Sequence, residues 1–417
     1  MGKPGDAAPP PDAFRILDPA VVENPYPFFR ALLDQAPVYR VPGTEVFLVS
    51  SWSLVHEVLK NQSDFSANLT GILISGENGE PDLFDLTQFG GTVDALVNAD
   101  EPFHAVHRRL VLPQLNARRV AALEGEVRDW ARQRVRALVG TGGGEAVAGL
   151  ANEIPVMVMA RLAGLPVNDV DQLLDWAFAG GEILAGTADL ARMAELGLAT
   201  RALSTYLRRH FAAALAAPAA EARCVIDELA AGVLSGVVTE SEAIAILVVL
   251  VGAAGESTSS LVGSALRLLA ADAQLQAQLR GNPALIEPFV EEVVRLESPF
   301  KGHYRVVLND TELGGVPLRA NARLFLLWAA ANRDPSVFSR AEAIDLQRAD
   351  GGDHLGFGHG IHFCIGARLA RLEARVIIEE LLGATAACRL DPADPPAHVS
   401  SIFVRRLARL PLLLDPA

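Results

Sequence analysis

Apolar side chains recur with helical spacing along most of the chain. The longest such segment, 239–269, is apolar all round its first half, which indicates a helix buried on every side. Thr239 and Glu242 at its start have the spacing of a capping box. A second helix is predicted over 368–382, where apolar residues recur with a period of about 3.6. With the mostly helix-patterned stretch 120–229, these segments predict a mainly α-helical protein.

Short β-rich runs predict a small amount of sheet. Residues 38–41 and 46–50 flank a Pro-Gly turn, and 310–318 contains two adjacent glycines, so both places are typical of hairpins. The segment 68–99 combines many glycines with apolar residues, and we interpret it as a long functional loop.

Composition narrows the possible classes of protein. The 417 residues are 50% hydrophobic and 21% charged, as in a globular protein, and the net charge of −14 argues against a nucleic-acid binder. Three cysteines without paired spacing indicate a reducing compartment. The longest apolar run, 243–254, is too short to span a bilayer, and the Pro-rich N-terminus predicts a frayed tail over 1–20 rather than a leader or anchor. We therefore expect a cytoplasmic protein that binds neither nucleic acid nor membrane.

A glycine-rich loop brings a single cysteine, Cys364, to the start of the 368–382 helix. Its glycines permit positive φ angles and close packing against something flat. Backbone N–H groups near a helix start favour a thiolate, and a thiolate inside an apolar loop requires a partner or a metal. The pattern predicts a lone thiolate ligand. The alternatives are an inert cysteine, and a zinc site of His359, His362 and Cys364 whose spacing does not suit tetrahedral coordination.

This loop resembles the haem-binding loop of cytochromes P450. The family pattern Phe-Gly-x-Gly-x-His-x-Cys-x-Gly is matched at every fixed position, by Phe357, Gly358, Gly360, His362, Cys364 and Gly366. The resemblance implies that Cys364 is the metal ligand of haem b, and that Phe357, Gly358 and Gly366 contact the cofactor. It extends over about 24–414 and implies one domain, 1–417, with the mainly α cytochrome P450 fold and a small β-rich region, of the soluble bacterial type.

The middle of the 239–269 helix carries small residues followed by an acid and alcohols. Glycine inside a helix costs about 1 kcal/mol relative to alanine, so its presence suggests room for a ligand. The segment resembles the oxygen-binding segment of P450s, which implies that Glu256 and Ser257 relay protons. Ala254 replaces the usual Gly and Ser257 the usual Thr. The second change removes the methyl that stiffens χ1 and puts the coupling of oxygen use to product in question. The alternative is a Ser257 hydroxyl bonded only within its own helix.

Basic residues are expected to bind the haem propionates. His104 and Arg108 are four residues apart and share a helix face, and arginine can hold a carboxylate through two hydrogen bonds. The resemblance implies that both bind a propionate, rather than forming a solvated basic face. It implies the same role for His303 and Arg305 in an extended run, and for His354 just before the loop.

The resemblance also implies a substrate pocket and a structural brace. The pocket residues would be Phe84, Phe89, Val251, Gly252, Ala253, Phe300, Ile402 and Phe403. These segments are apolar and low in charge, which suggests a lipophilic substrate. Glu292 and Arg295 match the Glu-x-x-Arg pair that braces the haem side of the family fold.

The implied activity is monooxygenation of a lipophilic small molecule by a monomer. O2 and electrons from a ferredoxin and its NAD(P)H-dependent reductase would be required. An acidic ferredoxin would dock on a basic patch. The patch would consist of Arg109, Arg368, Arg371 and Arg375, for which a solvated face is the alternative. The alternative functions are a haem-thiolate peroxygenase, a non-redox isomerase with the P450 fold, and a non-catalytic haem sensor.

Overall fold

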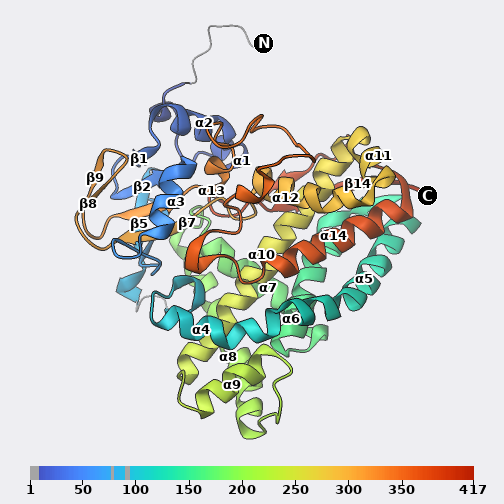
Figure 1. Cartoon of the computed structure of the whole chain (residues 1–417), viewed down its shortest axis with the longest axis horizontal. Coiled ribbons are helices and arrows are strands. Elements are labelled where there is room, and N and C mark those ends of the chain that lie inside the picture. Colours follow the sequence, from blue (N-terminus) through green and yellow to red (C-terminus); the bar gives the residue numbers. More distant parts are fainter. Residues whose placement is uncertain (1–8, 77–78, 90–93) are drawn as a thin grey trace.

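The computed structural model describes residues 9–76, 79–89 and 94–417, without the side chains of 88 and 89. Helices form most of it, several of the strands gather near the N-terminal part, and β14 lies on the other side of the molecule, near the C-terminus (Figure 1). The α-helices are α1 (Pro19–Glu23), α2 (Tyr26–Gln35), α3 (Trp52–Lys60), α4 (Phe103–Val111), α5 (Ala117–Gly140), α6 (Glu153–Ala163), α7 (Val170–Ile183), α8 (Leu190–Ala216), α9 (Val225–Leu234), α10 (Glu240–Ala271), α11 (Ala273–Gly281), α12 (Ile286–Glu297), α13 (Trp328–Ala331) and α14 (Ala367–Ala384). The strands are β1 (Val38–Arg40), β2 (Val46–Val49), β3 (Phe65–Ser66), β4 (Gly71–Ser75), β5 (Pro81–Asp85), β6 (Gly143–Glu145), β7 (His303–Val307), β8 (Thr311–Leu313), β9 (Val316–Leu318), β10 (Arg323–Leu326), β11 (Thr385–Leu390), β12 (Ala397–His398), β13 (Leu407–Arg409) and β14 (Pro411–Pro416).

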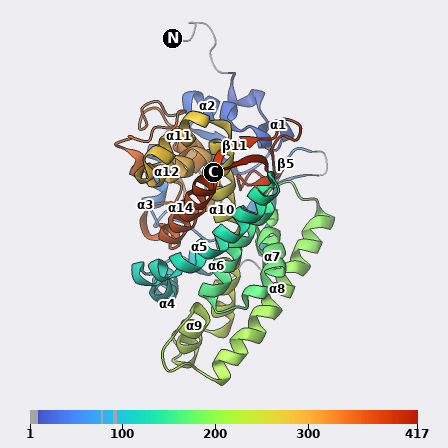
Figure 2. The ribbon, with the colours of Figure 1, turned by 90° about the vertical axis from the view of Figure 1, so that its right-hand side faces the viewer.

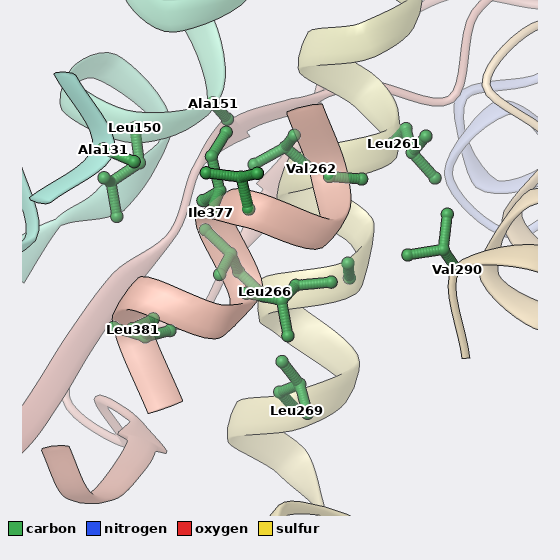
Figure 3. Close-up of a cluster of buried hydrophobic side chains, with 14 of the residues drawn as sticks. Ala131, Leu150, Ala151, Leu261, Val262, Leu266, Leu269, Val290, Ile377 and Leu381 are labelled. Atoms are coloured by element: carbon green, nitrogen blue, oxygen red, sulfur yellow. The ribbon is translucent and has the colours of Figure 1, made fainter. Parts of the chain in front are cut away.

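Helix α10 runs through the middle of the molecule and confirms the predicted central helix (Figure 1). Its capping box is formed: Thr239 Oγ1 accepts a hydrogen bond from the Glu242 N–H at 3.2 Å, and Glu242 accepts one from the Thr239 N–H at 2.7 Å. The first half of α10 packs in one apolar cluster with α6 to α9, and the second half packs in another with α5, α12 and α14. Figure 3 shows Leu266 of α10 beside Ile377 of α14 in that second cluster.

Within the described ranges, α10 is the one helix long and apolar enough to cross a membrane. However, 56% of its most apolar window is buried inside the fold. The core helix of a globular protein has these same properties, so the length and composition of α10 do not indicate a membrane segment.

The main sheet joins the N-terminal region to the segment that follows α12. Its strand order is β1-β2-β10-β7-β3, with β1 and β2 as the predicted hairpin and β10 parallel to β2. Strand β7 is antiparallel to β10 and carries His303 and Arg305. The predicted hairpin at 310–318 is also present, as β8 and β9.

Two expectations for the N-terminal region were wrong. The segment 68–99 is not a continuous loop, because β4 and β5 pair within it as an antiparallel hairpin. The predicted tail over 1–20 extends too far: Ile16 is buried in an apolar cluster, and the Tyr39 hydroxyl donates to Asp12 Oδ1 at 2.8 Å. The part of that tail over 1–8 lies outside the described residues.

The predicted brace of α12 is formed. Arg295 is completely buried and donates to both carboxylate oxygens of Glu292, at 2.7 and 2.9 Å. It also donates to the carbonyls of Asn332, Ala341 and Ala343. These bonds fix α12 to the chain that leads into the Cys364 loop, since a buried guanidinium requires all its donors to be satisfied.

Candidate active site

Backbone hydrogen bonds and glycines shape the loop that presents Cys364. The Cys364 N–H donates to the Phe357 carbonyl at 2.8 Å, which closes the loop on itself. Gly358 and Gly360 have φ angles of +69° and +68°, in the left-handed region that favours glycine. A Cβ on Gly356 would lie 2.5 Å from Val294 Cγ1, so α12 and the loop are in contact there.

The thiol of Cys364 has the surroundings of a metal ligand. It is partly accessible and forms no disulfide. Burial raises its pKa, while N–H groups of Gly366 and Ala367 and the positive charge of Arg108 act in the opposite direction. Donors of this kind stabilise a thiolate, whose remaining charge an iron or similar cation would compensate.

Five basic or imidazole side chains converge in front of the loop, and among the described residues only His104 contacts a carboxylate, that of Glu101 at 3.3 Å. They come from α4, from β7 and from the loop itself: His104, Arg108, His303, Arg305 and His362. The rings of His104 and His362 are 4.2 Å apart, and Arg108 Nη1 donates to the Phe363 carbonyl at 2.8 Å. Burial, Arg305 and the other members of the cluster lower the pKa of His362 to about 2, and its Nδ1 has no hydrogen-bond partner among the described residues.

Arg305 shows most directly that this cluster lacks a negatively charged partner. Its side chain is buried, and burial lowers its pKa to about 10. The bond that its guanidinium forms within the described chain goes to the carbonyl of Tyr304, at 2.7 Å, and no carboxylate there forms an ion pair with it. A buried cation without an anion is strongly unfavourable. The cluster therefore suits a ligand that brings carboxylates.

One face of α10 carries Ser257 and small residues. Ala253 is exposed and Gly252 and Ser257 are partly exposed, although α10 runs through the centre of the fold. Ser257 Oγ donates to the Ala253 carbonyl at 2.6 Å, which is the within-helix bond considered as an alternative to a relay. Val251 is completely buried in the cluster with α6 and α7, so its placement in the pocket was wrong.

Glu256 is held on the other side of α10 by two elements that the sequence did not connect with it. Its carboxyl is buried and accepts a hydrogen bond from Arg406 Nε at 3.2 Å. A Cβ on Gly181 of α7 would lie 1.5 Å from Glu256 Oε2, so the carboxyl rests against the bare backbone of that helix. Arg406 also stacks over the ring of Phe178, at 3.7 Å. Burial raises the pKa of Glu256 to about 7, which suits a group that exchanges protons near neutral pH.

Comparison with known proteins places this geometry in a family. The cytochrome P450 family model matches residues 226–384. A protein described as cytochrome P450 144, from Mycobacterium tuberculosis, is 38% identical over 404 residues, which cover 97% of this chain and 92% of that protein. Cytochrome P450 109 from Bacillus spizizenii is 28% identical over 394 residues, covering 93% and 91%.

The chain is a cytochrome P450. Its fold agrees with solved P450 structures. CYP109E1 from Bacillus megaterium, solved with testosterone, aligns with a TM-score of 0.83 at 26% identity and covers 95% of this chain and 99% of its own. A mutant of P450 EryK in complex with erythromycin B aligns with a TM-score of 0.80 at 28% identity, covering 96% and 97%.

P450s bind haem, and the residues of this P450 fit it. Cys364 would supply the thiolate ligand of the iron, and the cluster around Arg305 would supply donors for the two propionates. Ala253 and Ser257 leave an accessible face on α10. Phe357 lies behind the loop, where Arg371 stacks on its ring at 4.4 Å.

One predicted propionate ligand of the P450 was wrong and another was missed. His354 Nε2 lies 3.0 Å from Glu291 Oε2, and its Nδ1 accepts from the Gly356 N–H at 3.3 Å, so both ring nitrogens are engaged outside the cluster. Burial acts to raise the pKa of Glu291, but hydrogen bonds from Arg371 and His354 outweigh burial and lower this pKa to about 2. His362 lies in the basic cluster instead, and we infer that it is better placed than His354 to bind a propionate. It is the fixed histidine of the matched loop pattern, and this was the signal available in the sequence.

Four of the predicted pocket residues of the P450 lie in one apolar cluster, namely Phe84, Phe300, Ile402 and Phe403. The rings of Phe300 and Phe403 are 4.8 Å apart, and Phe403 lies 5.8 Å from His303 of the basic cluster. The side chain of Phe89 lies outside the described residues. The Lys301 N–H donates to the Phe403 carbonyl at 2.7 Å, so the segment after α12 and the C-terminal turn form one wall.

Proposed function

We propose that this P450 hydroxylates or epoxidises a lipophilic small molecule, using O2 and electrons from a ferredoxin served by an NAD(P)H-dependent reductase. Membership of the family already implies a haem monooxygenase in general. The observation that carries the proposal is the buried Arg305 guanidinium beside the Cys364 loop, which forms no ion pair with a carboxylate of the described residues and so suits a cofactor that brings carboxylates. The buried Glu256 carboxyl, which precedes Ser257 in the sequence and has a pKa of about 7, is better suited to an oxygenase than to a haem sensor.

Each residue of the candidate site would then have a distinct role. Bound haem would supply the O2-activating chemistry, and Cys364 would hold its iron as a thiolate ligand. The cluster around Arg305 binds the propionates and fixes the orientation of the cofactor. Glu256 takes up protons from the Arg406 side, and the Ser257 hydroxyl passes them on after leaving its bond to the Ala253 carbonyl.

The apolar cluster near the candidate site supports this substrate class. Phe84 and Phe300 are partly exposed and pack with buried Ile402 and Phe403, and such aromatic, apolar surroundings favour lipophilic compounds. Two structural relatives support this class, since one was solved with testosterone and another with erythromycin B. We propose a substrate of comparable lipophilicity.

The proposed docking patch for the ferredoxin is smaller than the sequence indicated. Arg371 is paired with Glu291 at 2.6 Å and Arg375 with Glu124 at 2.8 Å, so their charges are largely compensated. Exposed Arg109 and Arg368 form no ion pair among the described residues. Arg368 borders a cavity of about 720 Å³ between α5, α12 and α14, and Phe363, next to Cys364, is 42% exposed. These features support docking of an acidic donor on the thiolate side. We place the protein in the cytoplasm, as a monomer.

Optical titration of the ferric holoprotein with a library of lipophilic compounds tests the proposal. A substrate should shift the Soret band as it displaces water, and the same compound should be oxidised with NAD(P)H, ferredoxin and reductase. Turnover that requires added peroxide and ignores NAD(P)H would identify a peroxygenase instead. Product formation without any oxidant would identify an isomerase.

A further inference from the structure

Two histidines outside the haem site meet between α3 and the Cys364 loop. The Nε2 atoms of His56 and His359 are 3.1 Å apart. His56 is stacked on Trp52 one turn earlier in α3, with ring centroids 4.6 Å apart and planes at 17°. A Cβ on Gly360, next to His359, would lie 3.2 Å from the Leu59 carbonyl, so the loop and α3 are in close contact. Both imidazoles remain partly accessible to solvent.

The orientation of the two rings is unlike that of a straight hydrogen bond. A straight N–H···N bond of this length would hold the ring centroids about 5.4 Å apart, because each nitrogen would point at the other. The centroids are only 4.3 Å apart, with the planes at 51°. The rings of His56 and His359 therefore lie closer than in a straight hydrogen bond, an arrangement in which both Nε2 atoms can face one ion beside the pair.

The separation of the two nitrogens matches that of neighbouring ligands on one metal ion. At a metal–nitrogen distance of about 2.05 Å, two nitrogens are about 2.9 Å apart at a right angle and about 3.3 Å apart at a tetrahedral angle. The observed 3.1 Å lies between these values. Neutral imidazole is a preferred ligand of Ni²⁺, Cu²⁺ and Zn²⁺.

We propose that His56 and His359 bind a divalent transition ion of this class and thereby fasten α3 to the thiolate loop. The described residues contain no group of three or more His, Cys, Asp or Glu placed to hold a metal. Water therefore completes the coordination, and the ion exchanges freely with solvent. Lys60, one turn after His56, adds a positive charge that weakens binding. The site is independent of the haem iron and of the proposed oxygenase activity.

Isothermal titration of the untagged holoprotein with NiCl₂ tests the site. His56→Ala and His359→Ala should each weaken Ni²⁺ binding at least ten-fold and abolish retention on immobilised Ni²⁺. His210→Ala is the control, because His210 is a partly exposed histidine on α8, outside the pair. Cu²⁺ bound to the unmodified protein should show coupling to two nitrogens by electron paramagnetic resonance, and coupling to one in either variant.

Lys60→Gln tests the proposed metal site independently, because it removes a positive charge near His56. It should strengthen Ni²⁺ binding at low ionic strength and have a smaller effect at 1 M salt, where charges are screened. His359 belongs to the loop of Cys364, so its variant is checked for the carbon monoxide band of the haem. His56 lies on a separate helix and keeps the test valid if that loop is disturbed. Equal Ni²⁺ affinity in the unmodified protein and His56→Ala, or a loss that follows His210→Ala, would overturn the proposal.

Discussion

Replacing Arg406 should move the protonation of Glu256 to higher pH. Burial raises the pKa of Glu256 to about 7, and Arg406 opposes that rise through its charge and its 3.2 Å hydrogen bond. A hydrogen bond to a charged group contributes about 1.5–3 kcal/mol. One pKa unit corresponds to about 1.36 kcal/mol, so Arg406→Gln should raise the pKa by about 1–2 units. At pH 7 the carboxyl would change from about half ionised to mostly protonated.

Infrared titration measures this shift directly. The protonated carboxyl of Glu256 absorbs apart from ionised carboxylates, and its band is identified by its loss in Glu256→Gln. Arg409→Gln is the matched control, because Arg409 lies three residues on and pairs with Asp394 instead. We expect a midpoint near 7 in the unmodified protein and in the control. A midpoint that stays near 7 in Arg406→Gln would refute the assigned role of the pair.

The same pKa predicts how stability depends on pH. The folded state holds the Glu256 proton up to a pH of about 7, whereas the unfolded chain releases it near the ordinary glutamate pKa of 4.5. The folded state thus binds more protons between these values, and stability falls as pH rises through that window. The contribution is about 3 kcal/mol. Urea titrations should show this decline in the unmodified protein, and a flatter profile in Glu256→Gln.

The remaining predictions concern the packing of the Glu256 carboxyl against α7, the binding of haem and the role of Ser257. Gly181→Ala should displace the Glu256 carboxyl and shift its infrared band, whereas Gly180→Ala, whose Cβ would meet nothing within 4 Å, should leave it unchanged. Cys364→His should abolish the red-shifted carbon monoxide band; its persistence would remove Cys364 as the ligand. Arg305→Leu should speed haem transfer to apomyoglobin by ten-fold or more and stabilise the haem-free protein, which urea unfolding measures. Ser257→Ala should raise peroxide release relative to product, and unchanged coupling would exclude Ser257 from the relay.

The fold was predictable where the signal was local. The central helix carried its own capping box and an apolar first half, and the predicted range 239–269 corresponds to Glu240–Ala271. The region 68–99 failed because its glycines resembled a loop. In the structure, a Cβ on Gly71 would lie 3.1 Å from Leu83 and 3.2 Å from the Phe84 carbonyl. Gly71 allows two strands to approach closely, and the order of residues along the chain does not reveal that pairing.

The site was predictable to the extent that its residues are neighbours in sequence. The Cys364 loop was identified from a continuous pattern. The choice between His354 and His362 was not local, because it depends on Glu291 of α12, which binds His354. Arg406 and Glu256 are 150 residues apart, and no spacing rule connects them. Pairings of this kind are fixed by tertiary packing, so sequence spacing alone cannot assign them.

The error at Val251 could have been avoided by helical geometry. Successive residues turn by about 100° around a helix, so Val251 and Ala253 point about 200° apart and cannot share one face. Positions four apart do share a face, and this relates Ser257 to Ala253 and Ala253 to Val249. Val249 is partly exposed, as that relation requires. Substrate selection along α10 should therefore depend on Val249 and Ala253, while Val251 contributes to stability.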